Sequence, residues 1–240
     1  MRVREWWVRT TDQLRSHAIA DAEIEAEVLL RHAMGLGRAD YFAALDDQSS
    51  RPQEEIVERS VRRRLAGVPL AYILGHREFY GLDFSVNPSV LVPRQETEHL
   101  VDAILEHQRK RPRRSLVIAD VGTGSGAIAI AIARHLSIAS ICAIDRSHEA
   151  LLVAGMNRRR HAVTDRVHLI QGDLLGSLRE PVDVIVSNPP YLTTEELTRA
   201  QPEIRCEPSH ALDGGKDGLD TTRRLFRQAR GRLRPEGLMG

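Results

Sequence analysis

A nearly continuous apolar run at residues 116–121, Leu116-Val-Ile-Ala-Asp-Val, is the feature that most limits how this chain can fold. Strands that are covered on both faces have such continuous apolar sequences, whereas half-exposed strands alternate with polar residues. Similar runs occur at residues 139–144, 167–170 and 182–186, and a helical pattern follows each of the first two runs. This alternation predicts an α/β fold with an open, mostly parallel sheet and right-handed crossovers.

The part of the chain before this region predicts a small helical-bundle domain over residues 1–75. Apolar residues recur at helical spacing in residues 21–34, where we expect Ile24 to belong to the buried stripe. A second helix is expected over residues 51–65, because Pro52 is suited to the first turn of a helix.

Residues 76–94 predict a β-hairpin linker between the helical domain and the α/β domain, which we place at residues 95–240. Aromatic and β-branched residues surround Gly81 there, which is typical of a short hairpin.

The C-terminal region predicts a helix over residues 221–233 and a turn over residues 234–237. Only the start of a fifth strand would then precede Gly240. We therefore expect a sheet that lacks its C-terminal strands and has its fourth strand, at residues 182–186, as an exposed edge.

The charge of the chain is nearly balanced, with 34 Lys and Arg against 33 Asp and Glu. No bulk field therefore attracts the protein to nucleic acid or to an anionic membrane. The strongest charge run, Arg109-Lys-Arg-Pro-Arg-Arg, is interpreted as a solvated loop between a helix and a strand. The alternative is a contact to RNA or to an acidic partner surface.

The chain has two cysteines and no C-x-x-C pair, which favours a reducing compartment. The apolar N-terminal segment of a signal peptide is not visible, and the uncharged stretch at residues 121–133 is too short to span a bilayer. We therefore expect a cytoplasmic protein without a membrane partner. The histidines do not have the spacing of metal ligands, so we expect no metal site.

The first chemical signal is the segment Asp120-Val-Gly-Thr-Gly-Ser-Gly between a strand and a helix. Glycines at 122, 124 and 126 let the backbone turn sharply and let a ligand approach closely. The dinucleotide fingerprint needs G-x-G-x-x-G, but position 127 is Ala. The loop therefore favours a nucleoside site over a pyrophosphate site.

Two acidic residues follow the next two strands. Asp145 ends the second strand, where a carboxylate can accept hydrogen bonds from both ribose hydroxyls of a nucleoside. A role for Asp145 as a helix N-cap is less favoured, since Ser147 suits that position better. Asp173 follows the third strand, where it could meet an adenine or serve only as a loop residue.

The sharpest signal is Ser187-Asn-Pro-Pro-Tyr, directly after the fourth strand. Pro189 and Pro190 cannot continue a sheet, so they hold a stiff loop at the carboxyl end of the strand. Asn188, together with a proline carbonyl, can accept both hydrogens of a substrate NH2 group. Tyr191 supplies a flat face for packing against a planar group.

These motifs resemble those of class I S-adenosylmethionine-dependent methyltransferases that act on planar amino groups. Three further stretches are similar to the peptide chain release factor glutamine methyltransferases. The first is Pro69-Leu-Ala-Tyr-Ile-Leu-Gly-His-Arg-Glu-Phe-Tyr-Gly-Leu, and the second is Asn87-Pro-Ser-Val-Leu-Val-Pro-Arg-Gln-Glu-Thr-Glu. The third is Glu207-Pro together with Gly214-Gly-Lys-Asp-Gly-Leu-Asp.

The resemblance implies a Rossmann-like methyltransferase sheet and S-adenosylmethionine as cofactor. The cofactor would be bound by the following residues: Gly122, Thr123, Gly124, Ser125, Gly126, Asp145, Asp173, Leu174 and Asn188. The glutamine of the Gly-Gly-Gln motif of a release factor would enter beside Asn188, Pro189, Pro190 and Tyr191. The helical domain would dock the release factor, and the enzyme would be a monomer that uses no nucleic acid as substrate.

Two alternatives remain open from the residues. A nucleic-acid adenine methyltransferase can use the same Asn-Pro-Pro-Tyr loop to hold the amino group of a flipped base. A chain without the last strands can also be an inactive remnant.

Overall fold

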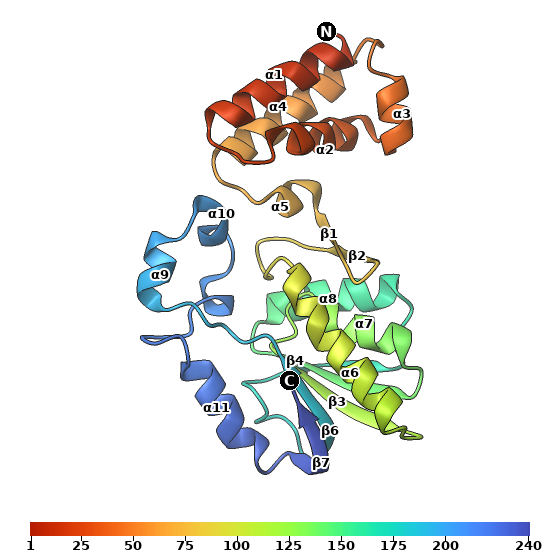
Figure 1. Cartoon of the computed structure of the whole chain (residues 1–240), viewed down its shortest axis with the longest axis vertical. Coiled ribbons are helices and arrows are strands. Elements are labelled where there is room, and N and C mark those ends of the chain that lie inside the picture. The colour runs from red at the N-terminus through yellow and green to blue at the C-terminus, as the bar shows by residue number, and fades with distance from the viewer. The chain divides into compact units, whose positions relative to one another are not determined.

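The computed structural model describes all 240 residues, and its internal contacts divide the chain into two compact units, Met1–Leu74 and Gly75–Gly240. The first unit is helical, whereas the second contains a sheet with helices packed on it (Figure 1). Each unit has its own hydrophobic core.

The N-terminal unit contains α1 (Val3–Ser16), α2 (Ala22–Met34), α3 (Arg38–Ala43), α4 (Arg51–Leu65) and α5 (Leu70–Leu74). The two predicted helices correspond to α2 and α4. The expected position of Ile24 is wrong, because its side chain is 62% exposed. The buried face of α2 instead contains Ala26, Leu29, Leu30 and Ala33, a stripe at helical spacing on another face of the helix.

The second unit is built on a five-stranded sheet, in which four of the strands correspond to the predicted apolar runs. Its strands are β3 (Leu116–Val121), β4 (Ala139–Asp145), β5 (Val167–Gln171), β6 (Val182–Ser187) and β7 (Leu233–Met239). Their order is β5-β4-β3-β6-β7, and all neighbours are parallel. The crossover helices from β3 to β4 and from β4 to β5 are α7 (Ala127–His135) and α8 (His148–Arg160).

The other elements of this unit connect to the sheet or cover it. A hairpin of β1 (His76–Phe79) and β2 (Leu82–Ser85) comes first, as predicted. The 3-10 turn η1 (Gln95–Thr97) and α6 (Glu98–Lys110) precede the sheet. Between β6 and β7 lie α9 (Thr194–Arg199), α10 (Pro202–Arg205), η2 (Ser209–Ala211) and α11 (Asp220–Ala229).

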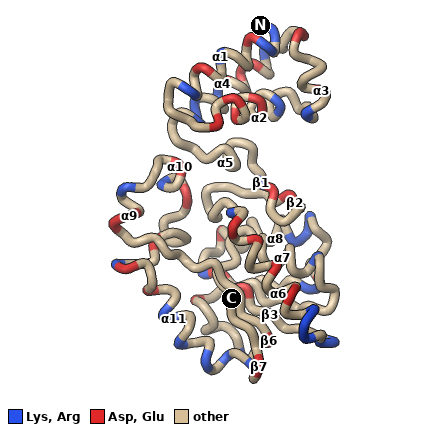
Figure 2. Tube along the Cα trace, in the orientation of Figure 1, with Lys and Arg blue, Asp and Glu red and all other residues tan.

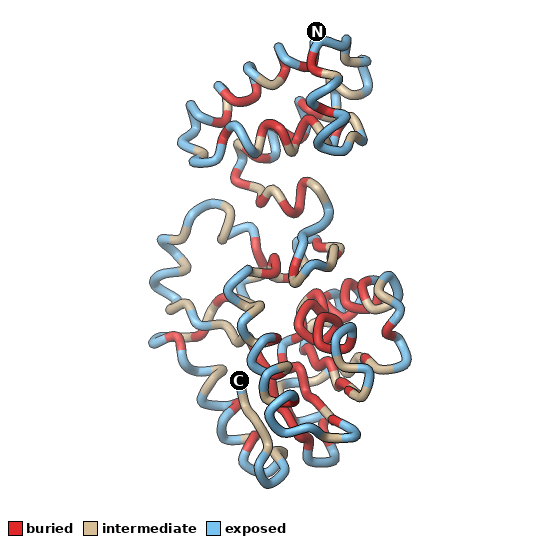
Figure 3. The backbone as a smooth tube through the Cα atoms, turned by 45° about the vertical axis from the view of Figure 1, so that its right-hand side comes forward, coloured by how far each residue is buried: buried red, intermediate tan, exposed pale blue.

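Helices cover both faces of the sheet, which explains why the central strands β3, β4 and β6 are mostly apolar and buried. Side chains of the hairpin, α6 and α7 pack on one face, and Leu225 and Ala229 of α11 pack on the other. Figure 3 shows buried residues concentrated in the sheet region of the second unit, where α7 is buried all round from Ala127 to Ala133.

The expectation that the fourth strand forms an exposed edge is wrong, because β7 pairs with β6. Residues 234–237 do not form a separate turn but continue β7, and α11 ends at Ala229 instead of residue 233. The pairing shifts register beside Val182 and Val184, and Glu236 has a positive φ of 61°. This bulge and the outer position of β7 allow a strand to contain Pro235, which lacks an N–H donor.

The predicted solvated loop is confirmed for residues 111–114, which lie between α6 and β3 with Arg111, Pro112 and Arg114 exposed. Arg109 and Lys110 form the end of α6, and Arg113 forms an ion pair with the buried carboxylate of Asp183. None of the helices is long and apolar enough to cross a bilayer.

Candidate active site

The carboxyl ends of β3 and β6 lie side by side and position the two sharpest sequence motifs. Val121 and Ser187, the last residues of these strands, are partners in the parallel register. The Ser187 hydroxyl donates a hydrogen bond of 2.7 Å to the Val121 carbonyl. Since neighbouring strands are about 4.8 Å apart, the glycine-rich loop and the Asn-Pro-Pro loop start next to each other.

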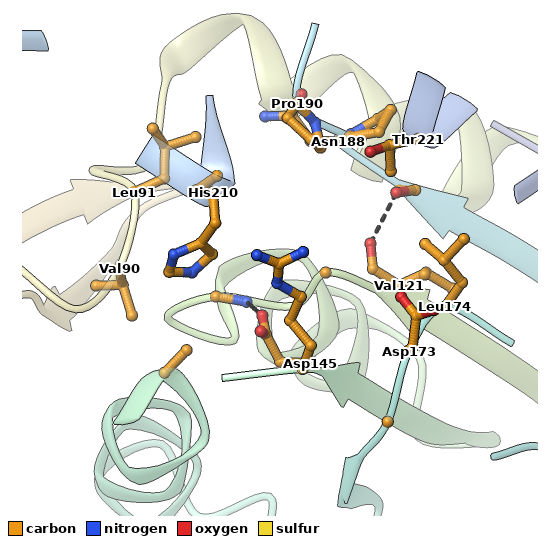
Figure 4. Close-up of a pocket in the computed structure, with 18 of the residues that line it drawn as sticks. Val90, Leu91, Val121, Asp145, Asp173, Leu174, Asn188, Pro190, His210 and Thr221 are labelled. Atoms are coloured by element: carbon orange, nitrogen blue, oxygen red, sulfur yellow. Dashed lines mark hydrogen bonds between the residues drawn. The ribbon is translucent and has the colours of Figure 1, made fainter. Parts of the chain in front are cut away.

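A pocket of about 800 Å³, partly open to solvent, lies at this edge of the sheet (Figure 4). Small-molecule sites occur where an open α/β sheet reverses its strand order. We call it the sheet-edge pocket. Its lining comes from seven chain segments: Ser89, Val90 and Leu91; Val121, Gly122 and Gly124; Asp145, Arg146 and Ala150; Gly172, Asp173 and Leu174; Ser187, Asn188, Pro189 and Pro190; His210 and Ala211; Thr221 and Arg224.

The glycine-rich loop leaves space for a ligand at two of its glycines. Gly122 and Gly124 line the pocket with φ values of 74° and 55°, and a Cβ added to either would meet no atom within 4 Å. Gly126 serves packing instead, because a Cβ there would lie 3.0 Å from Ile130 and 3.3 Å from Ala154. The loop thus offers bare backbone to a ligand and a close contact between α7 and α8.

Thr123 and Ser125 are both buried and are not among the lining residues. The Thr123 hydroxyl donates to Asp120 Oδ2 over 2.6 Å, and the Ser125 carbonyl accepts a bond of 2.8 Å from Asn157 Nδ2. These bonds fix the glycine-rich loop on the side that faces away from the pocket lining. Any contact of Thr123 or Ser125 with a cofactor remains a prediction.

Asp145 lies at the end of β4 with its carboxylate beside the glycine-rich loop. Oδ2 accepts a bond of 2.9 Å from the Gly124 amide, and Oδ1 accepts one of 2.9 Å from the Ser147 amide. The Ser147 hydroxyl in turn accepts from the Ala150 amide, so Ser147 is the N-cap of α8, as predicted. The two oxygens of Asp145 keep lone pairs for further donors at the pocket wall.

Asp173 and Leu174 follow β5 and line the side of the pocket opposite Val90 and His210 (Figure 4). Asp173 forms an ion pair with Arg224 of α11, which also lines the pocket. Leu174 adopts a left-handed backbone with φ of 51°. The apolar and acidic side chains of this wall suit a planar base that carries an amino group.

Asn188, Pro189 and Pro190 line the pocket, and Asn188 is held by a residue that sequence reasoning did not assign to the site. Asn188 Nδ2 donates a bond of 3.2 Å to the Thr97 hydroxyl. This bond sets the plane of the amide and leaves its oxygen to accept from a substrate. Thr97 lies within the quoted Asn87–Glu98 stretch, but no spacing rule connects it with Asn188, 91 residues later.

Tyr191 is not among the lining residues, and its side chain is 64% exposed. The backbone that follows is braced by the Gly214-Gly-Lys-Asp-Gly stretch, because the Gly214 amide donates to the Leu192 carbonyl over 2.7 Å. Gly218 packs so closely that a Cβ there would lie 2.3 Å from the Tyr191 carbonyl oxygen. The packing of the Tyr191 ring on a substrate therefore remains a prediction.

Glu207 connects its own segment with the Asn87–Glu98 segment. It is buried, accepts a bond of 2.9 Å from the Val92 amide and forms an ion pair with Arg94. These contacts hold the segment that contributes Val90 and Leu91 to the pocket. Without Arg94 the buried charge of Glu207 would lose its compensating partner, and without Glu207 the Val92 amide would lose its acceptor, so Glu207 supports this wall.

Asp120 is a buried carboxyl group under the glycine-rich loop. Burial raises its pKa to about 6, although the Thr123 hydroxyl and the Ala129 amide both donate to Oδ2. Its Oδ1 has no hydrogen-bond partner. Both facts disfavour the carboxylate, so the carboxyl group ionises at a higher pH in the folded chain than in the unfolded chain.

The raised pKa predicts that the contribution of Asp120 to the free energy of unfolding falls between about pH 4 and pH 6. The native state retains the proton of Asp120 there, whereas the unfolded state loses it, so ionisation costs about 3 kcal/mol of stability by pH 7. Asp120→Asn cannot ionise, so its stability relative to wild type should rise over this interval. Urea unfolding at pH 4, 5, 6 and 7 measures the difference; the exposed Asp165→Asn is the control, and parallel profiles for Asp120→Asn and wild type would contradict the assignment.

The pocket as a whole suits a nucleoside-bearing cofactor. Gly122 and Gly124 leave a cradle that a side chain would fill, and Asp145 supplies a carboxylate beside it. Asp173 and Leu174 form a wall for the base, and Asn188 supplies an amide at the neighbouring strand end. These residues fit S-adenosylmethionine, which carries an adenosine and a methyl group on a sulfonium.

Two family models match the chain. Residues 5–75 match the PrmC N-terminal domain, and residues 95–213 match the Methyltransferase small domain. Among solved structures, a Thermus thermophilus 16S rRNA N2 G1207 methyltransferase covers 68% of this chain and 40% of its own, with a TM-score of 0.51 and 19% identity. The hMettl16 catalytic domain covers 73% and 65%, with a TM-score of 0.51 and 16% identity. At these identities the likeness shows the fold alone.

Curated relatives match over nearly the whole chain. The release factor glutamine methyltransferase of Moorella thermoacetica is 44% identical over 100% of this chain and 84% of its own length. That of Rhodopirellula baltica is 39% identical over 99% and 81%. That of Deinococcus radiodurans is 36% identical over 100% and 84%. The chain therefore belongs to the release factor glutamine methyltransferase family, whose members are S-adenosylmethionine-dependent enzymes.

Proposed function

We propose that this protein methylates the side-chain amide nitrogen of the glutamine in the Gly-Gly-Gln motif of peptide chain release factors. The single observation that carries the proposal is the register pairing of Val121 with Ser187, which starts the cofactor loop and the Asn-Pro-Pro loop at adjacent strand ends. A methyl donor and a planar amide can then meet within one pocket. The helical region at residues 1–75 would dock the release factor, in the cytoplasm, and the enzyme would act as a monomer.

Each pocket wall has a distinct role in this proposal. Gly122 and Gly124, on a loop held by Thr123, Ser125 and Gly126, bind the methionine part of the cofactor through bare backbone. Asp145 accepts the ribose hydroxyls. Asp173 and Leu174 border the adenine, and Asn188 borders the methyl group.

Methyl transfer uses the amide nitrogen of the glutamine as nucleophile, and this nitrogen is a weak nucleophile in solution. The lone pair of an amide nitrogen is delocalised into its carbonyl, and bound S-adenosylmethionine supplies a methyl group that is strongly electrophilic. Asn188 Oδ1 and the Pro189 carbonyl accept the two N–H groups of the glutamine, which favours a localised lone pair and aims it at the methyl group. Pro190 keeps the loop stiff, and Tyr191 packs beside the substrate backbone.

Thr97 is expected to position Asn188 without touching either substrate. Thr97→Val removes the acceptor for Asn188 Nδ2, so the amide can turn away from its working orientation. We expect kcat to fall by about tenfold while the Kd of S-adenosylmethionine stays unchanged, since one modest hydrogen bond is lost. Thr97→Ser keeps the hydroxyl and should restore kcat; equal loss in both variants would refute the role.

The proposed function is tested with the full chain, S-adenosylmethionine and a purified release factor. Mass spectrometry of the peptide that contains Gly-Gly-Gln should show one methyl group on the glutamine. A release factor with Ala in place of that glutamine is the matched control and should remain unmodified. Methyl transfer to DNA or RNA instead of the release factor would favour the adenine alternative.

A further inference from the structure

The edge of the sheet opposite the pocket gathers positive charge from separate parts of the chain. Ile118 pairs with Val184, and Val182 pairs with Leu233, so the amino ends of β3, β6 and β7 form one row. Adjacent parallel strands are about 4.8 Å apart, so the row is about 10 Å wide. The segments that lead into these strands therefore meet at one edge.

Each of these segments carries arginines. Arg111 and Arg114 precede β3, Arg179 precedes β6, and Arg230 and Arg232 precede β7. We call these residues the basic edge. Figure 2 shows Lys and Arg positions at the lower end of the second unit, where α6 passes into β3 and α11 passes into β7.

Hydrogen bonds tie the three segments together. The buried carboxylate of Asp183 pairs with Arg113 and with Arg234, the latter over 2.9 Å, and accepts a bond of 2.8 Å from the Val117 amide. Arg232 Nη1 also donates to the Arg179 carbonyl over 2.9 Å. The three segments that carry the arginines are thus held together by specific contacts and not only by topology.

The basic edge is not neutralised by its surroundings. Arg109 and Lys110 have a local explanation, because they pair with Glu106 and complement the C-terminal dipole of α6. None of the five arginines of the basic edge forms an ion pair with a carboxylate, although Glu180 and Glu236 lie in the same segments. All five are exposed or half-exposed.

We propose that the basic edge binds the phosphate backbone of RNA. Guanidinium groups match phosphate oxygens with paired N–H donors, and several of them on segments that meet at one end of a sheet suit a polymer with regularly spaced anions. These segments contain no aromatic residue that could stack on bases, so the contact reads the backbone and not the sequence. RNA is chosen because release factors act in translation, and in this respect the inference rests on the proposed function.

The placement leaves the active site free. The pocket lies at the carboxyl ends of strands of about six residues, so about 20 Å of sheet separates it from the basic edge. RNA would therefore dock on the protein at the basic edge and would not be the methyl acceptor. The near-neutral total charge is compatible with this, because binding depends on the local cluster.

The test is fluorescence anisotropy with a labelled 20-nucleotide RNA and the full chain, without cofactor or release factor. We expect the combined variant Arg111→Gln, Arg114→Gln and Arg230→Gln to bind at least about tenfold more weakly at low salt. The slope of log K against log salt should also fall by about 2 for three lost phosphate contacts. The charge-matched control exchanges three exposed arginines of α4, Arg51, Arg59 and Arg62, and should bind as the wild type does.

Other outcomes overturn the inference. These are an equal loss in the control variant, a salt-independent wild-type affinity, or tighter binding of polyglutamate or duplex DNA than of RNA. The wild-type salt slope alone decides the matter if the triple variant does not fold. Because no methyl transfer is measured, failure here is distinct from failure of the proposed function, which the release factor assay reports.

Discussion

Asn188→Ala is expected to lower kcat by about 1,000-fold while S-adenosylmethionine still binds. The variant loses the oxygen that accepts an N–H of the substrate amide, and removing one such group from a preorganised site costs about 10² to 10³ in rate. The cofactor cradle depends mainly on Gly122, Gly124 and Asp145, which the substitution does not touch. Methyl transfer is followed by mass spectrometry and cofactor binding by isothermal titration calorimetry.

A matched control for this variant is Gln201→Ala. Gln201 is also an amide residue directly before a proline, but it is exposed and does not line the pocket. It should retain wild-type kcat and cofactor affinity. Turnover within tenfold of wild type in Asn188→Ala would refute the assignment of Asn188 to the reaction.

Asp145→Ala is expected to weaken the binding of S-adenosylmethionine by about 100-fold. Its carboxylate would hold the ribose hydroxyls and already accepts a bond from the Gly124 amide, so the substitution removes ligand contacts and loosens the loop together. A hydrogen bond to a charged group contributes about 1.5–3 kcal/mol, which corresponds to a factor of about 10 to 100 in Kd. Calorimetric titration gives the Kd directly.

Asp165→Ala is the control for Asp145→Ala, because its side chain is 73% exposed in the same unit. Its Kd should equal that of the wild type. Thermal melting of both variants shows whether the Asp145 variant remains folded. Unchanged affinity in a folded Asp145→Ala variant would remove Asp145 from the cofactor site.

Local patterns were sufficient for most of the second unit. The apolar runs predicted four strands, because strands covered on both faces need continuous apolar sequence. The positions of α7 and α8 followed from helical periodicity and the glycines before α7. The failures were at β7 and Ile24. Pro235 and Gly237 resemble a turn when viewed alone, and an amphipathic helix with several apolar positions permits more than one buried face.

The pocket shows a similar division. Motif spacing could point to Gly122, Asp145 and Asn188, because the carboxyl ends of successive parallel strands meet at one sheet edge. It could not identify Thr97 as the partner of Asn188, or Glu207 as the support of the Val92 segment. It also could not show that the Tyr191 ring lies outside the pocket lining.

Residues close together along the chain therefore specified the strands, the helices and the glycine turn, since backbone preferences and burial periods act over a few residues. Contacts such as Asn188 with Thr97, Asp183 with Arg113 and Arg234, and β7 with β6 emerged only from the folded arrangement. They join segments far apart in sequence, and no local rule selects one partner among many. That selection depends on the packing of the whole unit, where burial of the sheet repays the entropy of closing long loops.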